Sequence, residues 1–331
     1  MRIAIIGGSG FVGSRLISLL QTIPDSKLLN IDKQPSKLCP DITEIADVLD
    51  VRKLTELLVG IEVVVLLAAE HRDDVTPTSL YYKVNVEGMH NTLHAMKSNG
   101  ISRLIFTSSV AVYGLNKSNP TELHPTDPFN DYAHSKWQAE CALQRWYTTH
   151  QDWNINILRP TVIFGEDNRG NVYNLLRQIT SGRFLMVGTG ENRKSMAYVG
   201  NVVSFITFLI KNSRQGYNVF NYIDKPDFTM NDLICHVGNA LNKHIPTVRF
   251  PYWLGVLGGY GFDLFARITR KKLSVSSVRV KKFCAVTQFD SVRLQESGFK
   301  PTFTLEEGLT RTLQYEFGFE ESYGCLVGTH A

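Results

Sequence analysis

The chain has 331 residues, of which 43% are apolar and 20% charged, so it is long and apolar enough to bury a large core. Lys and Arg outnumber Asp and Glu by 35 to 31, and a net charge of only +4 argues against a nucleic-acid partner. The five cysteines are far apart and include no C-x-x-C, which indicates neither a disulfide framework nor a metal site. Since we find no signal peptide and no membrane-spanning stretch, we expect a cytoplasmic protein.

The first half alternates between apolar strands and helices. We predict strands at Arg2–Ile6, Lys27–Ile31, Thr43–Val48, Glu62–Leu67 and Arg103–Ser108, and helices at Phe11–Gln21, Val51–Leu58 and Ser79–Lys97. Near-continuous apolar strands between helices are typical of a parallel sheet that is covered on both faces. The fold class that we predict is therefore α/β, a Rossmann-type doubly wound parallel sheet.

The second half follows a looser pattern. A helix from Asp131 to Thr148 and a strand at Ile155–Leu158 continue the alternation. Further helices are predicted near Val172–Ser181, Val202–Lys211, Met230–Leu241 and Leu305–Glu316, separated by segments that we interpret as irregular. We expect a first domain at residues 1–165, to which segments of the second half return, and a smaller C-terminal α/β substrate lobe at residues 166–331.

The turn after the first strand has the spacing G-x-x-G-x-x-G, at Gly7, Gly10 and Gly13. Glycines let the backbone approach a pyrophosphate closely, and the helix that begins at Phe11 and Val12 offers free N–H groups. Asp32 ends the second strand, where a carboxylate can bind both ribose hydroxyls of adenosine and repels a 2′-phosphate. The pattern predicts a dinucleotide site that prefers NAD to NADP.

Tyr132 and Lys136 form a Y-x-x-x-K pattern on a predicted helix, so the two side chains lie one turn apart on the same face. The lysine ammonium favours tyrosinate, which a tyrosine with an ordinary pKa of about 10 rarely adopts at neutral pH. Thr107-Ser108-Ser109 ends a predicted strand at the carboxyl edge of the sheet, where α/β proteins bind their ligands. A serine there can orient a substrate alcohol or ketone, so the pattern predicts a site with a tyrosine base.

Several motifs follow one another along the chain: Gly7-x-x-Gly10-x-x-Gly13, Asp47-Val48, Leu67-Ala68-Ala69, Asn85-Val86-x-Gly88, Ser108-Ser109-Val110-Ala111-Val112-Tyr113-Gly114, Tyr132-x-x-x-Lys136 and Leu158-Arg159-Pro160. In this order they resemble the extended short-chain dehydrogenases/reductases of the sugar epimerase and dehydratase type. The resemblance implies that Tyr132 is the catalytic base, Lys136 its partner and Ser109 the hydroxyl that binds the substrate. It also implies further NAD contacts, at Asp47, Val48, Leu67, Ala68, Ala69, Asn85, Thr107 and Pro160.

Departures from the family pattern bear on the substrate. Val110 and Ala111 stand where sugar 4,6-dehydratases carry Asp-Glu, so we do not expect dehydration. Lys194 stands where the resemblance implies an arginine that grips a nucleotide diphosphate, and Gly200-Asn201 replace the acids that usually follow. Either the uridine end of the ligand is absent or bound differently, or the sequence of this surface loop has diverged without a change of ligand. The resemblance implies substrate contacts at Ser109, Asn171, Lys194 and Thr287.

An apolar segment at Pro251–Ala266 contains one charged residue, Asp263, and is followed by four cations, Arg267, Arg270, Lys271 and Lys272. Apolar and aromatic residues followed by cations are typical of a segment that lies in a membrane interface, and this one is too short to span. A buried helix pair is the alternative. We therefore expect, for residues 251–272, peripheral association with the inner face of the cell membrane.

Three stretches, at Ala68–Val75, Val162–Asn174 and Val278–Ala285, resemble a narrower bacterial branch of the family. Its members are 4-epimerases that convert N-acetylglucosamine, linked through diphosphate to undecaprenol, into N-acetylgalactosamine for O-antigen assembly. The resemblance implies a lipid-linked sugar as the partner. A soluble UDP-N-acetylglucosamine 4-epimerase, a net NAD-dependent sugar or sterol dehydrogenase and a non-catalytic NAD-binding protein stay open as alternatives, and a homodimer stays open as the assembly.

Overall fold

The computed structural model describes the chain except residues 73–74, 183, 213–214, 247, 270–283 and 319–331, and of residues 259 and 261–268 it describes the backbone alone. The chain divides into two compact units. The first contains Met1–Ile163, Ala197–Ile223 and Phe289–Phe303, and the second contains Phe164–Met196, Asp224–Gln288 and Thr304–Ala331. Two segments from the second half of the chain thus belong to the first unit.

A single parallel sheet forms the centre of the first unit. Its strands are β1 (Arg2–Ile6), β2 (Lys27–Asp32), β3 (Thr43–Ile45), β4 (Val63–Leu66), β5 (Arg103–Thr107), β6 (Asn154–Pro160) and β10 (Gly216–Tyr222). They lie in the order β10-β6-β5-β4-β1-β2-β3, and every neighbouring pair is parallel. The order reverses between β1 and β4, the place where such sheets bind ligands. The predicted Rossmann-type sheet is confirmed.

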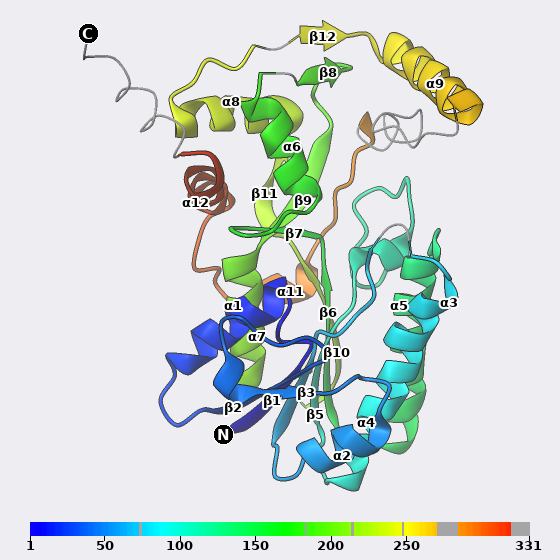
Figure 1. The fold of residues 1–331 in the computed structure, drawn as a ribbon, viewed down its shortest axis with the longest axis vertical. Helices are drawn as coiled ribbons and strands as arrows, with labels where there is room; N and C mark the ends of the chain where they lie inside the picture. The colour runs from blue at the N-terminus through cyan, green and yellow to red at the C-terminus, as the bar shows by residue number, and fades with distance from the viewer. Residues whose placement is uncertain (73–74, 183, 213–214, 247, 270–283, 319–331) are drawn as a thin grey trace, which may run out of the picture. The chain divides into compact units, whose positions relative to one another are not determined.

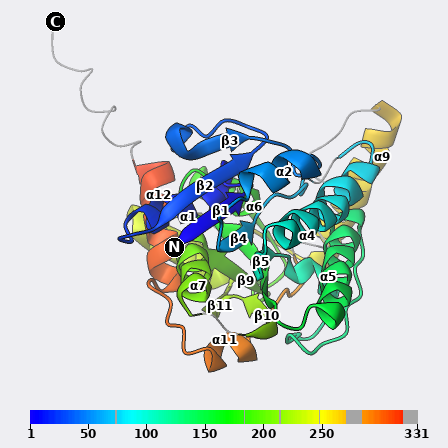
Figure 2. The same ribbon diagram turned by 90° about the horizontal axis from the view of Figure 1, so that it is seen from below.

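Helices cover both faces of this sheet, as Figures 1 and 2 show. One face is covered by α1 (Phe11–Gln21) and α7 (Val199–Lys211), and the other by α2 (Val51–Leu57), α4 (Gly88–Ser98) and α5 (Asp131–Thr149). Shorter helices are η1 (Pro40–Ile42), α3 (Ser79–Tyr82), η2 (Lys83–Glu87), η3 (Val110–Tyr113) and α11 (Val292–Glu296). Because side chains alternate along a strand, Ala4 and Ile6 pack towards α4 and its Leu93, and every residue of β6 is buried. Burial on both faces explains the unbroken apolar runs.

The prediction of irregular segments after Pro160 is wrong for residues 162–164, 185–187, 193–198, 224–229 and 248–250, which form short strands, and it is also wrong for residues 216–222. The latter residues form β10, which pairs with β6 along its whole length, from Gly216 beside Asn154 to Tyr222 beside Pro160. This strand lies at the edge of the sheet, and its first three residues are only half-buried. It therefore lacks the continuous apolar run that marks the central strands.

The second half also supplies two smaller sheets and several helices. The elements are β7 (Val162–Phe164), α6 (Asn171–Thr180), β8 (Leu185–Val187), β9 (Arg193–Tyr198), β11 (Asp224–Thr229), α8 (Met230–Leu241), β12 (Val248–Phe250), α9 (Tyr252–Thr269) and α12 (Leu305–Phe317). The sheet orders are β11-β9-β7 and β12-β8. Both α8 and α12 begin with a capping box, in which Thr229 bonds with Asp232 and Thr304 with Glu307, and this satisfies the first N–H groups of each helix.

From Tyr252 onward the apolar segment lies in one helix, α9. Trp253 is 64% exposed and Leu257 is 61% exposed, so the described part of α9 has an apolar surface. None of the described helices is long and apolar enough to cross a membrane. Arg270, Lys271 and Lys272, the cations expected to meet the membrane, lie outside the described residues, as does the side chain of Arg267.

Candidate active site

The glycine turn joins β1 to α1 in a conformation that excludes side chains. Gly7 has a φ of +89°, and a Cβ placed there would lie 2.4 Å from the backbone nitrogen of Ala68. A Cβ on Gly13 would lie 2.4 Å from the Cα of Gly8. Gly10 is the N-cap of α1 and has no side chain to occupy the first N–H groups, which therefore face the turn unshielded. Such an N-terminus is suited to a pyrophosphate.

Asp32 is fixed beside this turn at the end of β2. Its carboxylate accepts one hydrogen bond from the backbone nitrogen of Ser9, at 3.0 Å, and another from that of Gln34, at 2.9 Å. A carboxylate has about four acceptor positions, so two backbone bonds leave capacity for ribose hydroxyls. The structure thus places the predicted acid where it can bind a ribose beside the turn.

The remaining residues predicted to contact NAD follow the carboxyl ends of neighbouring parallel strands. Leu67 and Ala68 follow β4, and their backbone nitrogens both donate to the carbonyl of Ile6 at 2.8 Å. Val48 is buried under α4, and Asp47 beside it is exposed. The sheet therefore brings the predicted residues to one edge: Gly7, Gly10, Phe11, Val12, Gly13, Asp32, Asp47, Val48, Leu67, Ala68, Ala69, Thr107 and Pro160.

Lys136 is an almost fully buried cation on α5, with 2% of its surface exposed. Its Nζ donates to the carbonyl of Thr107 at 2.8 Å and lies 4.9 Å from the ring centroid of Phe106. Burial lowers the pKa of Lys136 to about 7, although the carboxylate of Glu140 acts against this. The Oγ1 of Thr107 is buried and has no hydrogen-bond partner among the described residues. A polar ligand at this edge would find both an ammonium group and a hydroxyl group.

Tyr132 lies one turn before Lys136, and its side chain is half-buried. Burial raises the pKa of Tyr132, and hydrogen bonding with Ser109 lowers it. Ser109 caps η3, where its Oγ accepts the backbone N–H of Ala111 at 3.1 Å. The three residues predicted to be catalytic, Ser109, Tyr132 and Lys136, therefore lie around one point at the sheet edge.

Asn85 ties the turn after β4 to the helix that carries Tyr132. Its Oδ1 accepts from the backbone nitrogen of Glu70 at 2.9 Å, and its Nδ2 donates to the Glu70 carbonyl at 3.1 Å and to Ser135 Oγ at 2.8 Å. Ser135 in turn donates to the carbonyl of Tyr132 at 2.8 Å. Asn85 lies in η2, a π-helical segment that interrupts the continuous helix predicted at 79–97. Such segments are frequent at functional sites.

A buried polar network behind the catalytic residues was not predicted from the sequence. Arg159 Nη2 lies 2.5 Å from Glu140 Oε2, and Ser108 Oγ donates to Glu140 Oε1 at 2.5 Å. Arg159 also donates to the hydroxyl of Tyr113 at 2.7 Å, and Tyr113 donates to Asn221 Oδ1 at 2.7 Å. The network joins α5, η3, β6 and β10 with Ser108, the residue that follows β5. The local sequence feature that could have indicated this network is the position of Glu140, one helical turn after Lys136 on α5.

The family model described as the NAD dependent epimerase/dehydratase family matches residues 3–222. The chain belongs to this family. A protein of Escherichia coli O157:H7 named N-acetyl-alpha-D-glucosaminyl-diphospho-ditrans,octacis-undecaprenol 4-epimerase is 59% identical over 316 residues, which are 95% of each chain. A UDP-glucose 4-epimerase of Vibrio cholerae is 27% identical over 94% of each chain. The solved UDP-glucuronic acid 4-epimerase of Bacillus cereus in complex with NAD has a TM-score of 0.74 at 19% identity, over 95% of this chain and 98% of that one.

Two of the residues predicted to contact the substrate, Lys194 and Thr287, lie together in the second unit. Lys194 pairs with Thr287 in a parallel bridge. The carbonyl of Thr287 accepts from the backbone nitrogen of Ser195 at 2.9 Å, and its own nitrogen donates to the carbonyl of Arg193 at 3.1 Å. Lys194 Nζ donates to the carbonyl of Ala285 at 2.5 Å, and burial lowers its pKa to about 8. The third residue, Asn171, begins α6, a separate element, and its side chain is exposed.

The departure at Gly200-Asn201 from the family pattern has a structural explanation. Asn201 is fully buried in the first unit, where its side chain accepts from the backbone nitrogen of Phe303 at 2.9 Å and donates to the carbonyl of Phe303 at 2.8 Å. An amide can make this pair of bonds, whereas a carboxylate can only accept. Asn201 therefore fixes a returning segment of the first unit.

Proposed function

We propose that this chain is a NAD-dependent 4-epimerase that interconverts N-acetylglucosamine and N-acetylgalactosamine on an undecaprenyl diphosphate carrier, for synthesis of a surface polysaccharide such as O-antigen. The observation that carries the proposal is the 59% identity, over 95% of both chains, with the Escherichia coli relative of that name. Ser109, Tyr132 and Lys136 lie together at the carboxyl edge of the sheet and supply the acid–base groups that a 4-epimerase needs.

The residues at the sheet edge fit NAD. The turn at Gly7 and Gly13 has no room for a Cβ, which leaves backbone N–H groups open to a pyrophosphate. Asp32 would bind the adenosine ribose, and Lys136 with the unpartnered Thr107 hydroxyl would bind the ribose of the nicotinamide. When bound, NAD supplies the acceptor, and later the donor, of a hydride.

The protein's own residues would handle the proton and the substrate oxygen. Tyr132 accepts the proton of the 4-hydroxyl group, and the neighbouring Lys136 ammonium stabilises the tyrosinate. Ser109 holds the 4-oxygen as the alcohol becomes a ketone. Once the ketone has turned its other face to the site, Tyr132 returns the proton. Val110 and Ala111 offer no acid or base, so the site has no group at these positions for eliminating water.

The test compares two substrates of the purified full-length protein. We expect undecaprenyl-diphosphate-linked N-acetylglucosamine to be converted to the galacto epimer without accumulation of NADH, and Tyr132→Phe to be inactive. Conversion of UDP-N-acetylglucosamine alone would favour the soluble epimerase instead. Stoichiometric NADH formation would favour a net dehydrogenase, an activity named in more distant relatives such as the human sterol-4-alpha-carboxylate 3-dehydrogenase, 24% identical.

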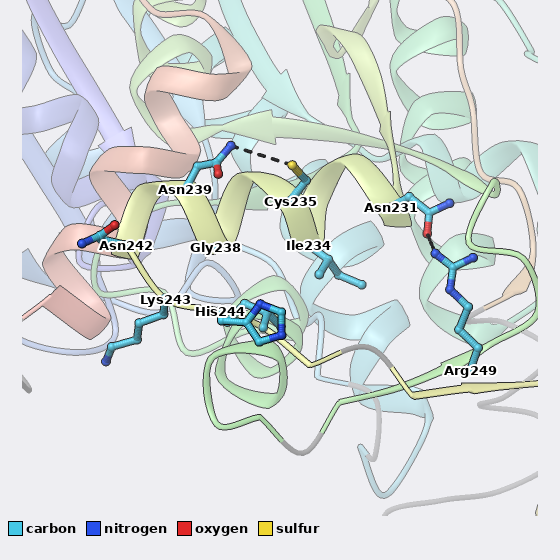
Figure 3. A pocket seen from close by; sticks show the side chains of 10 residues that line it. Asn231, Ile234, Cys235, Gly238, Asn239, Asn242, Lys243, His244 and Arg249 are labelled. Atoms are coloured by element: carbon cyan, nitrogen blue, oxygen red, sulfur yellow. Dashed lines mark hydrogen bonds between the residues drawn. The ribbon is translucent and has the colours of Figure 1, made fainter.

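We further propose that α9 and its surroundings associate with the inner face of the cell membrane. Besides Trp253 and Leu257, the second unit exposes Val248 by 51% and Phe250 by 39% on β12, which directly precedes α9. Exposed aromatic and aliphatic groups of this kind partition into a bilayer interface. A hollow beside α8, shown in Figure 3, is lined by Lys243, His244 and Arg249 and by no acidic side chain of the described residues, which favours an anionic surface.

Flotation with phosphatidylglycerol-containing vesicles tests this proposal. We expect the wild type to float and the double variant Trp253→Ser, Leu257→Ser to stay with the soluble fraction. Leu123→Ser is the matched control, because Leu123 is 81% exposed but belongs to the first unit. Equal flotation of all three proteins, or none by the wild type, would contradict the proposal. The homodimer also stays a proposal, which sedimentation equilibrium would test.

A further inference from the structure

An arginine that is linked through Tyr81 to Tyr132, the proposed base, is held by a buried acid. Arg72 follows the turn after β4, and its Nε and Nη2 donate to the two carboxylate oxygens of Glu70 at 2.9 and 2.7 Å. The side chain of Glu70 is 6% exposed, whereas the side chain of Arg72 is 69% exposed. The arginine, through its hydrogen bonds, holds the pKa of Glu70 at about 2, so the pair stays ionised at neutral pH. A buried acid thus fixes an exposed cation.

Two routes connect Arg72 to Tyr132. Along the first, the hydroxyl of Tyr81 donates to the carbonyl of Arg72, and the ring of Tyr81 lies 6.4 Å from the ring of Tyr132. Along the second, the backbone of Glu70 is bonded on both sides to Asn85, whose amide also bonds the helix that carries Tyr132. The backbone that carries the Glu70–Arg72 pair is therefore bonded to residues that contact Tyr132 or its helix.

The geometry of the ion pair leaves one edge of the guanidinium for a ligand. Glu70 occupies the side-on edge, formed by Nε and Nη2, whereas the end-on edge is formed by Nη1 and the outer N–H of Nη2. Among the described residues, which leave out the adjoining 73–74, Nη1 has no partner. A guanidinium edge binds phosphate oxygens in a bidentate manner, and it does so with little loss of entropy when it is already fixed.

We propose that Arg72 binds the diphosphate of the substrate through this end-on edge. The inference rests on the proposed function, which supplies a sugar linked through diphosphate. Lys194, the residue that the family pattern assigns to this task, is half-buried and bound to the carbonyl of Ala285. During 4-epimerisation the keto sugar ring must rotate in the site while the rest of the substrate stays bound. A cation in a fixed position is suited to hold the diphosphate during this rotation.

The test uses farnesyl diphosphate, a soluble prenyl diphosphate without a sugar, as the probe for the NAD-loaded full-length protein. We expect calorimetry to show a Kd that rises roughly 10- to 100-fold in Arg72→Gln, the scale of a lost charge-assisted hydrogen bond. The KM for the lipid-linked sugar should rise by a similar factor while kcat changes less than about threefold. Arg72→Lys should recover part of the affinity, because it keeps the charge without the planar edge.

Arg145→Gln is the matched control, since Arg145 is exposed on the same helix as Tyr132 and lies 13 residues further along. It should leave both constants unchanged. An unaltered Kd for farnesyl diphosphate in Arg72→Gln, loss of bound NAD in Arg72→Gln and Arg72→Lys alike, or no binding by the wild type would each overturn the inference. If the wild type binds the probe through Arg72 but does not epimerise the lipid-linked sugar, the proposed function fails, whereas the assignment of Arg72 as a diphosphate-binding residue stands.

Discussion

Replacement of Glu140 by Gln tests how much stability the network behind the catalytic residues provides. Glu140 is 1% exposed and Arg159 is 6% exposed, and their closest nitrogen and oxygen atoms are 2.5 Å apart. The variant keeps the size of the side chain but removes the charge, which leaves the Arg159 guanidinium buried without an ionised partner. Breaking a buried pair in this way costs about 3–5 kcal/mol. We expect the free energy of unfolding to fall by this amount.

The expected change in melting temperature follows from the size of the unit. For domains of about 150–250 residues, each kcal/mol corresponds to roughly 2–4 °C, so Tm should fall by roughly 6–20 °C. Urea unfolding followed by circular dichroism measures the free energy, and a thermal scan measures Tm. Glu56→Gln is the matched control, because Glu56 pairs with Lys53 on the surface of α2 at 3.9 Å. Its removal should cost less than about 0.5 kcal/mol.

A double variant separates the lost charge pair from the altered packing. Glu140→Leu combined with Arg159→Met replaces the ion pair by apolar side chains and leaves no unpaired charge, so it should recover much of the lost stability. Tyr113 keeps its bond to Asn221 in this variant. The reasoning is refuted if Glu140→Gln costs less than about 1 kcal/mol, or if the double variant is less stable than the single one.

Three further predictions concern the catalytic residues and the cofactor. Tyr132→Phe should keep bound NAD but lose at least about 100-fold in turnover, and near-normal turnover would show that another group is the base. NAD should bind more tightly than NADP in calorimetry, because the Asp32 carboxylate repels a 2′-phosphate; equal affinities would rule out this role. Burial lowers the pKa of Lys136 from its usual 10.5 to about 7, so between these pH values the unfolded state binds more protons and the free energy of unfolding rises with pH. Lys136→Met should lack this rise in urea titrations at pH 7 and 10, and equal slopes for both proteins would disprove it.

Local patterns in the sequence predicted the central elements of the first unit. β1 and α1 begin and end where the apolar run and the glycine turn indicate, because both signals lie within a few residues of the element. β10 was missed because its position depends on pairing with β6, some 60 residues earlier in the chain. The helix predicted at 79–97 was placed correctly, but hydrophobic periodicity does not reveal the π-helical segment that carries Asn85.

The residues of the candidate site also fall into two groups, those that local sequence patterns predicted and those that depend on tertiary contacts. The spacing of Tyr132 and Lys136 puts them on one helix face, and the end of a recognisable strand indicated a serine at 108–109, of which the family resemblance implied Ser109. The pairing of Glu140 with Arg159 could not be predicted, because it depends on how α5 lies against β6. The bidentate ion pair between Glu70 and Arg72 is local in sequence. An acid two residues before an arginine is common, however, and only the burial of the Glu70 side chain distinguishes this pair.

The division of the chain into interleaved units affects how it can fold during synthesis. The chain passes between the units after residues 163, 196, 223, 288 and 303, so no single cut produces either unit alone. β6 is buried along its whole length, with β5 on one side and β10 on the other. Until residues 216–222 have left the ribosome, one side of β6 has no partner strand, and an unpaired edge of this kind invites aggregation. The nascent chain must therefore hold an incomplete sheet while part of the other unit is being made, which makes this interval the expected point of dependence on chaperones.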